Sequence, residues 1–595
     1  MDPINVDFTG GGKKDDGKKT SVKDILIPPE HAGRKIAVCL VITVILAAVL
    51  YYFMLPALNF KAIELYLYIA FVCLIYIGLM ILSTKLFTQP EYGPYVRKQS
   101  RVPLIIIGVL AAVALVGYLV GATIFRADDY SKLMTVEEGD FAADVAEIDF
   151  SSVPVLDEAS ATTIAARTFG DLSDYVSQFA ISAGYSTQIN YQGTPVRVYP
   201  LAYGDIFKWL RNTGDGLPAY IIVDMTTEET QVIRLEDGGM RYTPDEHFNR
   251  YLPRYLRFKH PTMLFGTPSF EIDENADPYW IVPILDKTIG LFGGTDVIGA
   301  AVVNAVTGGI TIVSTSRTGE TDLPTEEFVT DEEWQWIDRV YNAAIINEQY
   351  NYYGKLSGGF FNSIFGQEGV SVVSSGYNYL ALNDDVYMFT GVTSITSDQS
   401  IIGFILSNQR TKETKFYPIS GALEDTAKAS AEGAVQQYAY KATFPLLLNI
   451  SGEPTYFMAL KDAGGLVKQF AMVNLKQSTV VGVGNDLTSC TEAYAHELAI
   501  NGINVDIDVD EMGAEGDPTS QTPATRDVTG NVTEIRSVVT GGETYFYIRL
   551  DSSEAYYKVA VADAERVVLL NVGSAVTFTV GAESEGEIID VVSMQ

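Results

Sequence analysis

Three uninterrupted apolar runs near the N-terminus dominate the hydrophobic pattern of the chain. They cover residues 36–60, 65–84 and 102–125, and none contains a charged side chain. Each run reaches the roughly 20 residues that an α-helix needs to cross the hydrocarbon core of a bilayer. A cleaved signal peptide has a shorter apolar core and is not followed by two more such runs. The pattern therefore predicts three transmembrane helices within residues 36–126.

The Lys and Arg residues beside these runs predict the orientation of the helices. The first 35 residues, which we expect to form a disordered tail, hold Lys13, Lys14, Lys18, Lys19, Lys23, Arg34 and Lys35. The second connection holds Lys85, Arg97, Lys98 and Arg101, whereas the first is nearly neutral. We therefore expect a multi-pass plasma-membrane protein with a cytoplasmic N-terminus and an extracytoplasmic region after about residue 126. The basic tail is suited to contact anionic lipid headgroups.

After an acidic connector at residues 127–154, the pattern of apolar residues predicts a first α+β region at residues 155–320. Residues 156–184 have small and apolar residues at three- and four-residue spacing, which predicts a helix. Strands are predicted at residues 188–191, 196–199, 220–224 and 231–235. These strands are separated by short turns, so they are expected to pair as antiparallel hairpins.

A related hairpin recurs along the chain. Strands that begin at Pro278 and Pro454 are each turned back at a pair of glycines, and a divergent third copy begins at Pro218. A second α+β region is predicted at residues 321–505. It contains a hairpin-like run at 385–390, 401–408 and 415–418, and helices at 424–441 and 487–500. An exposed hairpin needs a helix to cover one face. The predicted fold class is thus a large α+β ectodomain of antiparallel sheets covered by helices.

One turn in these hairpins resembles a known family. Asn304-Ala305-Val306-Thr307-Gly308-Gly309-Ile310 resembles the closing hairpin of PepSY domains, where an acidic residue, a Thr-Gly turn and a returning strand are usual. Asn304 replaces the usual acidic residue, and Asp224-Met225-Thr226-Thr227 is a fainter copy. The resemblance implies a helix-on-hairpin fold, the cell envelope and peptidase regulation, but no catalytic residues. The whole arrangement is similar to large, poorly characterised membrane proteins of Gram-positive bacteria.

The C-terminal part of the chain is predicted to be a small barrel behind a linker. Residues 506–528 are rich in Asp, Gly, Thr and Pro, which is typical of an acidic linker. Within residues 529–595, strands are predicted at 531–539, 544–550, 556–561, 575–580 and 587–592. A short helix at 563–570 lies between the third and fourth strands, and this order favours an OB-like β-barrel.

The charge distribution along the chain restricts the classes of partner that the large region after residue 126 could bind. The formal charge is +5 before Asp128 and −38 from that residue onward. Such an excess repels anionic polymers, so we expect no nucleic-acid binding. Cys39 and Cys73 lie in apolar runs, which leaves only Cys490 in the large region. A disulfide within that region is therefore excluded, and the fold must depend on apolar cores.

A basic and aromatic island at residues 241–260 interrupts the acidic region. It contains Arg241, Arg250, Arg254, Arg257 and Lys259, interleaved with five Tyr and Phe residues. Guanidinium groups and aromatic rings suit phosphate or carboxylate ligands, so these five residues are candidate anion-binding residues. Lipid headgroups, teichoic-type polymers and acidic faces of the same protein are candidate ligands. The alternative is a set of internal ion pairs with the surrounding Asp and Glu residues.

Motifs for catalysis, metals and cofactors are missing from the sequence. It contains no Gly-x-Ser-x-Gly, His-Glu-x-x-His or Cys-x-x-Cys, so we expect neither cofactor nor metal. The acidic run from Asp506 to Asp517 lacks the glycine and closing glutamate of a calcium loop, and a solvated linker explains it better. Carboxylate pairs remain open as acid–base catalysts, with Asp384-Asp385 and Glu424-Asp425 the first candidates. A turn and a helix N-terminus explain these two pairs better than catalysis does.

The sequence therefore leads to three functional hypotheses. The first is a non-enzymatic envelope protein, a scaffold or interaction module for other envelope proteins or for itself. The second is an envelope hydrolase that uses two carboxylates on cell-wall glycan or peptide, about 5 to 10 Å apart in an open cleft. The third, from the PepSY resemblance alone, is a regulator of an envelope peptidase.

Overall fold

The N-terminal helices confirm the three predicted spans. The computed structural model describes residues 27–595, with gaps at 146–152, 236–237, 318–322, 383–384, 504, 506–524, 541–542, 554, 561–564, 582–587 and 595. Its first three long helices are α1 (Ala32–Met54), α2 (Ile63–Ser83) and α3 (Gly93–Val120), which follows a short 3₁₀ turn, η2 (Pro90–Tyr92). All three are long and apolar enough to cross a membrane, which indicates a membrane protein.

Two ends of these helices differ from the predicted runs. Helix α1 ends at Met54, six residues before the apolar run does, and Leu55 adopts a left-handed conformation with φ 52°. Proline at position 56 explains the early end, because the residue before a proline is disfavoured in a helix. Helix α3 begins upstream of its run, so Arg97, Lys98 and Arg101 form part of its first turns.

The connector after α3 belongs partly to the folded region. It forms α4 (Thr123–Ser131), β1 (Val136–Glu138) and α5 (Phe141–Asp144). Strand β1 pairs in parallel with β16 (Thr414–Tyr417). The Lys415 ammonium lies 3.2 Å from the Asp144 carboxylate. The chain is thus fixed to the sheets soon after it leaves α3.

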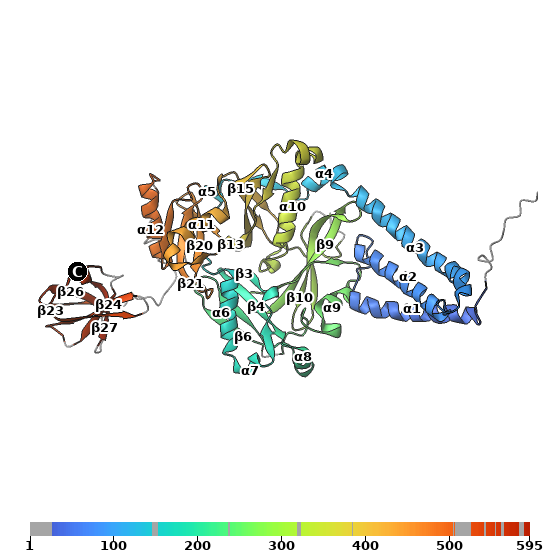
Figure 1. The fold of residues 1–595 in the computed structure, drawn as a ribbon, viewed down its shortest axis with the longest axis horizontal. Helices are drawn as coiled ribbons and strands as arrows, with labels where there is room; N and C mark the ends of the chain where they lie inside the picture. The colour runs from blue at the N-terminus through green and yellow to red at the C-terminus, as the bar shows by residue number, and fades with distance from the viewer. Residues whose placement is uncertain are drawn as a thin grey trace, which may run out of the picture. The chain divides into compact units, whose positions relative to one another are not determined.

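Four copies of one folding unit make up residues 158–484, and we call them repeats 1 to 4 (Figure 1). Each repeat has a helix, a short strand and a four-stranded antiparallel meander whose second strand also pairs with the short strand. Repeat 1 comprises α6 (Glu158–Gly170), β2 (Phe179–Ile181), β3 (Thr187–Tyr191), β4 (Thr194–Tyr203), β5 (Ala219–Asp224) and β6 (Thr230–Arg234). Repeat 2 comprises α9 (Leu252–Lys259), β7 (Leu264–Phe265), β8 (Ser269–Ile272), β9 (Pro278–Ile289), β10 (Gly293–Asn304) and β11 (Ile310–Ser314).

Repeats 3 and 4 follow the same order. Repeat 3 comprises α10 (Ala343–Leu356), β12 (Ser371–Val373), β13 (Asn378–Leu382), β14 (Asp385–Ser394), β15 (Ser397–Asn408) and β16, with β17 (Gly421–Ala422) added beside β15. Repeat 4 comprises α11 (Glu424–Ala434), β18 (Lys441–Ala442), β19 (Leu446–Ile450), β20 (Glu453–Lys461), β21 (Val467–Asn474) and β22 (Val481–Gly484). Helix α12 (Leu487–Ile500) then packs on β21 and β22. These sheets confirm an α+β region of antiparallel sheets.

The last turn of each meander is built in the same way. Asn304 Oδ1 accepts hydrogen bonds from the backbone N–H of Val306 at 3.1 Å and of Thr307 at 2.9 Å. Asp224, Asn408 and Asn474 each accept from the N–H groups two and three residues ahead in the same manner. Asn and Asp favour this geometry because their short side chains reach their own backbone. The turn at Asn304 and its fainter copy at Asp224 are therefore two of four equivalent turns.

Secondary structure departs from expectation mainly around two helices. The helix predicted at 156–184 ends at Gly170, and a short α7 (Ser173–Val176) and β2 follow. The helix predicted at 424–441 gives way after Ala434 to a 3₁₀ turn, η8 (Gln436–Tyr438), and to β18. Glycines at 170 and 433 lie at these points, and glycine weakens a helix interior. The helix predicted at 487–500 is confirmed as α12.

Apolar cores join the repeats to one another. One core contains Val198 of repeat 1, Trp280 of repeat 2 and Phe457 of repeat 4. A second joins Ile281 of repeat 2 to Met388 of repeat 3, and a third joins repeats 3 and 4. A buried aliphatic or aromatic side chain contributes about 1.5–3 kcal/mol. The four repeats therefore form one body rather than separate modules, and we call residues 123–503 the body.

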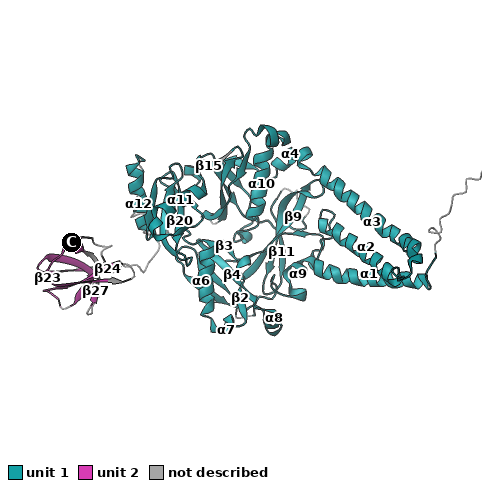
Figure 2. Cartoon of the chain, in the orientation of Figure 1, with its two compact units in different colours: residues 1–512 teal, residues 513–595 magenta. Residues whose placement is uncertain are grey.

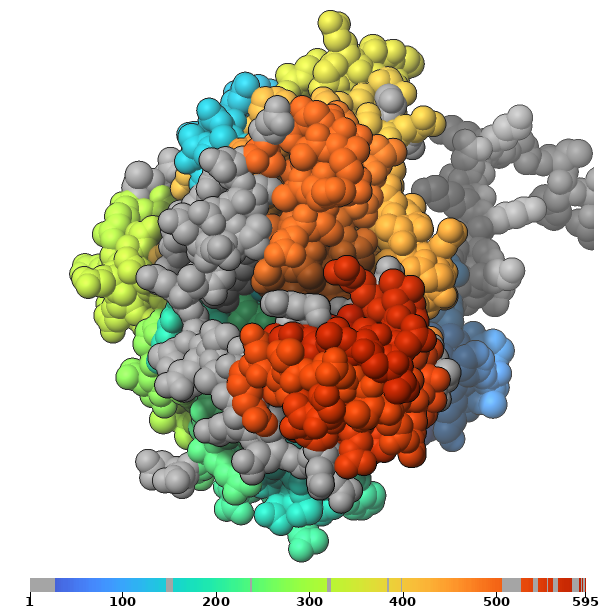
Figure 3. All heavy atoms as spheres, turned by 90° about the vertical axis from the view of Figure 1, so that its left-hand side faces the viewer, coloured from blue at the N-terminus to red at the C-terminus, as the bar shows by residue number. Residues whose placement is uncertain are grey.

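The C-terminal residues form a second compact unit (Figure 2, Figure 3). Strands β23 (Thr525–Thr540), β24 (Glu543–Leu550), β25 (Tyr556–Ala560), β26 (Ala575–Gly581) and β27 (Ile588–Met594) close into a barrel. The strand order is β23-β24-β25-β27-β26, and a 3₁₀ turn, η9 (Glu565–Leu569), lies between β25 and β26. Ile548, Tyr557 and Phe578 are buried in its core. All five predicted strands are confirmed.

Candidate functional site

The second half of the basic island forms α9, the helix of repeat 2, where the body meets α1. Helix α9 begins with Pro253 in its first turn, and the 3₁₀ turn η5 (Phe248–Arg250) precedes it. Leu252 and Leu256 are buried in the core shared by the repeats. Arg254 and Arg257 are also buried, which is unusual for charged side chains. Their partners explain the burial.

Arg254 binds the C-terminal end of α1. Its Nε donates to the Tyr52 carbonyl at 2.8 Å, and its Nη1 donates to the Phe248 carbonyl at 2.6 Å. The guanidinium carbon lies 4.0 Å from the centre of the Tyr52 ring, within cation–π range. One arginine thus ties the last turn of a membrane helix to the body.

Arg257 completes the same contact one turn further along α9. Its Nε donates to the Leu55 carbonyl at 3.1 Å, and its Nη1 donates to the carbonyls of Pro261 and Met263. Burial lowers the pKa of Arg257 below the ordinary arginine value. The last four carbonyls of a helix have no partner within the helix and carry its negative dipole end. The two guanidinium groups supply both hydrogen bonds and positive charge to that end of α1.

The other three candidate residues do not join Arg254 and Arg257 around one anion. Arg250 Nη1 donates to the Thr213 carbonyl, at the C-terminal end of α8 (Ile206–Asn212). Lys259 is exposed, with its ammonium 5.9 Å from the Tyr255 ring. Arg241 donates through its backbone to the Ala305 carbonyl. In the described part of the chain, none of the five forms an ion pair with a carboxylate, in contrast to the alternative of internal ion pairs.

The loop between α1 and α2 forms a second contact with the body. The Leu58 backbone N–H donates to the Pro261 carbonyl at 2.7 Å, and Asn59 Nδ2 donates to the Thr262 carbonyl at 3.0 Å. The Lys61 ammonium lies 2.8 Å from the Asp286 carboxylate on β9. The loop between α1 and α2 is therefore fixed to repeat 2 by both hydrogen bonds and an ion pair.

The tip of the β9–β10 hairpin forms a third contact, against α2 and α3. The rings of Phe292 and Tyr66 meet edge to face with centres 5.5 Å apart. Gly290 approaches so closely that a Cβ atom on it would lie 2.8 Å from the Gly121 Cα. Tyr130 Oη, on α4, donates to the Gly121 carbonyl at 2.8 Å. All three membrane helices thus contact repeat 2.

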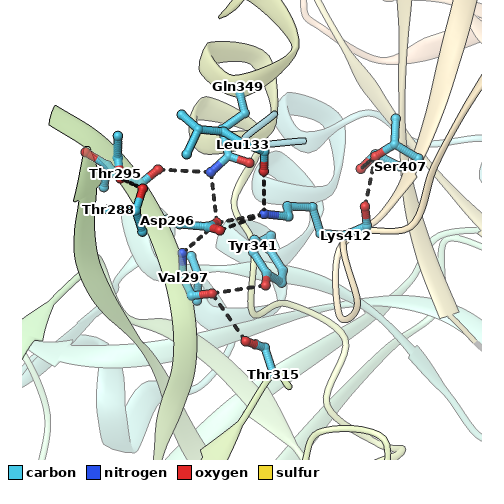
Figure 4. Close-up of polar contacts among 12 residues, drawn as sticks. Leu133, Thr288, Thr295, Asp296, Val297, Thr315, Tyr341, Gln349, Ser407 and Lys412 are labelled. Carbon is cyan, nitrogen blue, oxygen red and sulfur yellow. Dashed lines mark hydrogen bonds and ion pairs between the residues drawn. The ribbon is translucent and has the colours of Figure 1, made fainter. Parts of the chain in front are cut away.

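A half-buried ion pair joins repeats 2 and 3 behind this junction (Figure 4). The Lys412 ammonium lies 2.8 Å from Asp296 on β10 and donates to the Leu133 carbonyl, just after α4, at 3.0 Å. Gln349 Nε2, on α10, donates to Asp296 Oδ1 at 2.9 Å. The segment that leaves α3 is therefore held by two repeats at once.

A cavity of about 540 Å³ lies beside the docked end of α1. Its lining includes Phe53 of α1, Ile206 of α8, Phe248 and Arg254. Glu246, buried at its edge, accepts hydrogen bonds from Trp209 Nε1 at 2.6 Å and from Tyr203 Oη at 2.7 Å. These bonds hold α8 against the segment that contains the basic island.

Two fully buried carboxylates, Glu271 and Asp338, lie deeper in the body, and no sequence motif marks them. Glu271 accepts from the backbone N–H of Asp338 at 2.9 Å and of Arg339 at 3.1 Å. Asp338 accepts from the backbone N–H of Asn190 at 2.6 Å. Burial raises the pKa of Glu271 to about 7, and burial together with the charge of Glu271 raises the pKa of Asp338. The pair joins repeats 1 and 2 to the segment before α10.

The carboxylate pairs singled out in the sequence have structural partners. Asp385 is half of a buried ion pair with Arg410 at 2.7 Å, and Asp384 lies outside the described residues. Glu424 accepts from the Gly391 N–H at 2.9 Å and from Ser374 Oγ at 2.7 Å. Asp425 lies 3.3 Å from Lys428 in the first turn of α11. The acidic run from Asp506 to Asp517 lies outside the described residues.

A second cavity, of about 630 Å³, is both acidic and aromatic. Its lining includes Asp273, Glu274, Glu332, Glu333, Tyr279, Trp334 and Trp336. The Tyr279 and Trp336 rings lie 4.9 Å apart. Among the residues that the structure describes, no cluster of three His, Cys, Asp or Glu side chains could hold a metal ion.

Comparison with known proteins does not change this description. No protein-family model matches the chain, and no curated protein matches it significantly.

Proposed function

We propose that this protein is a membrane-anchored scaffold or interaction protein of the cell envelope, with its body and terminal barrel outside the cytoplasm. The observation that carries the proposal is the docking of the α1 end on Arg254 and Arg257. A flexible tether would need no such contact. Buried hydrogen bonds at the junction instead support a body that is held in a fixed orientation on its membrane helices.

Contacts and flanking charges support one orientation of the chain in the membrane. The loop between α1 and α2 contacts the body. This contact supports an even number of membrane crossings between that loop and the body. The second connection, with Lys85, Arg97, Lys98 and Arg101, is the more basic and is expected on the cytoplasmic side. Body and barrel then lie on the opposite side, which agrees with their strongly acidic composition.

The repeats and the barrel supply the interaction surfaces of the proposed scaffold. The repeats resemble PepSY domains in their helix, their meander and the closing turn at Asn304, which supports an envelope role. The barrel has the strand order and the helical turn between its third and fourth strands that OB-like folds have, and such barrels bind proteins and other polymers. We propose that the barrel binds another envelope protein or a second copy of this chain.

Two versions of the protein test this proposal in native membranes. The full chain and a chain ending at Met512 are crosslinked in cells and isolated. We expect the full chain to yield a defined crosslinked envelope partner or dimer that the shorter chain does not, while both remain in the membrane. A reporter after Gln595 that proves cytoplasmic, or equal crosslinking by both chains, would overturn the proposal.

The acidic and aromatic cavity favours the hydrolase hypothesis as a second candidate. Carboxylates beside aromatic rings fit an acid–base site on a glycan. The test is turnover of peptidoglycan by the purified full chain, with Glu332→Gln and Glu333→Gln compared with Glu492→Gln, an exposed glutamate on α12. Loss of turnover in either cavity variant alone would favour the enzyme over the scaffold. The regulator hypothesis fails if crosslinking recovers no protease.

A further inference from the structure

Helix α8 presents an apolar face to solvent close to the end of a membrane helix. Ile206, Phe207 and Leu210 are all exposed, and Phe207 is 78% exposed. Trp209, between them, is buried and donates to Glu246. Lys208 and Arg211 alternate with the apolar residues in sequence. Apolar and basic residues on one short helix are typical of segments that lie in the interface of a membrane.

The position of α8 beside α1 is fixed by direct contacts. Ile206 and Phe53 line the same cavity, and Phe53 belongs to the last turn of α1. Arg250 binds the carbonyl of Thr213, which caps α8. The exposed ring of Phe248 lies against Trp209 with centres 5.7 Å apart. The apolar face is therefore continuous with the part of α1 that leaves the bilayer.

The position of α8 within repeat 1 also supports its closeness to the membrane helices. Helix α8 connects β4 to β5, the second and third strands of the meander in repeat 1. In repeat 2 the same connection is the β9–β10 tip, where Leu291 and Phe292 contact α2 and α3. The second-to-third-strand connections of the first two repeats thus both present apolar side chains next to the membrane helices.

A second exposed apolar patch lies next to α4. The π-helical turn η7 (Asn362–Gly366) and the residue before it expose Phe361, Ile364 and Phe365, the last 80% exposed. It follows α10, whose C-terminal half packs on α4: the rings of Tyr352 and Tyr130 lie 4.6 Å apart. Because α4 directly follows α3, this patch is also close to the C-terminal end of a membrane helix.

We infer that α8 and η7 rest in the headgroup region of the leaflet on the same side as the body, on two sides of the membrane helices. The occupant of both patches is lipid of the same bilayer that α1, α2 and α3 cross. Burial of large apolar side chains in the interface would add to the docking at Arg254 and Arg257. This contact goes beyond the scaffold proposal, since it requires only that the three helices cross the membrane.

A fluorescent label and quenching lipids test the inference on the full chain in nanodiscs. Phe207→Cys and Phe365→Cys are labelled with bimane, and the discs contain phospholipid with brominated acyl chains near the headgroup. The three natural cysteines are buried, and the labelled parent chain corrects for them. Ile500→Cys, 64% exposed at the end of α12, is the matched control on the helix that packs against repeat 4. We expect quenching at positions 207 and 365 to exceed that at position 500 by roughly twofold or more.

A label inside the bilayer separates the two proposals. Leu115→Cys on α3 should be quenched strongly whenever the helices are inserted. Strong quenching at position 115 with no more at 207 and 365 than at 500 overturns the inference and leaves the scaffold proposal standing. No quenching at position 115 overturns membrane insertion, and both proposals fail with it.

Discussion

At the residue scale, the two buried arginines act on a part of α1 that water would otherwise solvate. Tyr52 and Leu55 offer carbonyl oxygens that a helix C-terminus leaves without a partner. The composition of residues 241–260 identified Arg254 and Arg257 as functional candidates. It could not reveal their partners, because a backbone carbonyl has no sequence signature and lies 202 positions away.

Replacement of either arginine should weaken the junction. We expect Arg254→Ala and Arg257→Ala each to destabilise the full chain by about 2–3 kcal/mol, because a buried carbonyl loses a charged donor. Arg254→Lys should recover only part of this, since one ammonium lacks the planar fork of a guanidinium. Thermal unfolding in nanodiscs measures the change. Lys259→Ala, exposed on the same helix, is the control and should change stability by no more than about 0.5 kcal/mol.

Glu271 should make the stability of the body depend on pH. Its pKa is about 7 in the folded chain and 4.5 as the ordinary value, so the folded state holds the proton longer. The contribution of Glu271 to the free energy of unfolding is therefore fully present below about pH 4.5 and is lost as the pH rises through about 7. We expect the temperature of the unfolding midpoint to decrease as the pH is raised from 5 to 8. Glu271→Gln should reduce the slope of that temperature against pH. Glu424→Gln, which removes a buried carboxylate from another repeat, should keep the slope; if it flattens the slope equally, Glu271 is not the cause.

At the element scale, four sheets are built by the same succession of a helix, a short strand and a meander. The alternation of apolar residues and the glycine turns identified nearly all of the long strands. The sequence disclosed related hairpins only in repeats 1, 2 and 4. Repeat 3 was missed because β14 begins without a proline and the β14–β15 turn at residues 394–397 has no pair of glycines. The sequence pattern also missed α8, whose seven residues are too few for a helical period to be recognised.

The β9–β10 tip should tolerate no side chain at Gly290. Its φ is +64°, and a Cβ atom would lie 2.8 Å from the Gly121 Cα. We expect Gly290→Ala to cost about 1–2 kcal/mol for the left-handed backbone and about 1–3 kcal/mol more for overpacking. Gly193→Ala, at φ +80° with open space around it, isolates the first cost. Equal shifts in thermal unfolding for the two variants would show that the tip is not held against α3.

At the scale of the whole molecule, the chain consists of a body docked on its membrane helices and a barrel that forms a compact unit of its own. Hydropathy and flanking charge predicted the membrane helices, since a span is defined by length and composition alone. How the repeats share their cores could not be predicted, because such packing depends on contacts between segments hundreds of residues apart.

Removal of the barrel should leave the body intact. We expect a chain ending at Met512 to keep the unfolding midpoint of the body, because the two compact units have separate cores. Only the transition of the barrel itself should disappear from the thermogram in nanodiscs. A lowered midpoint or aggregation of the shorter chain would show that the body depends on the barrel.

The contact between α1 and α9 also sets an order of events during synthesis. A growing chain lengthens at roughly 5–20 residues per second, so Arg254 leaves the ribosome about 10–40 seconds after Tyr52. Throughout that interval α1 is complete while its carbonyls at 52 and 55 still lack their final donors. The finished junction is thus assembled late, and the insertion machinery or lipid headgroups must solvate the end of α1 until repeat 2 has folded.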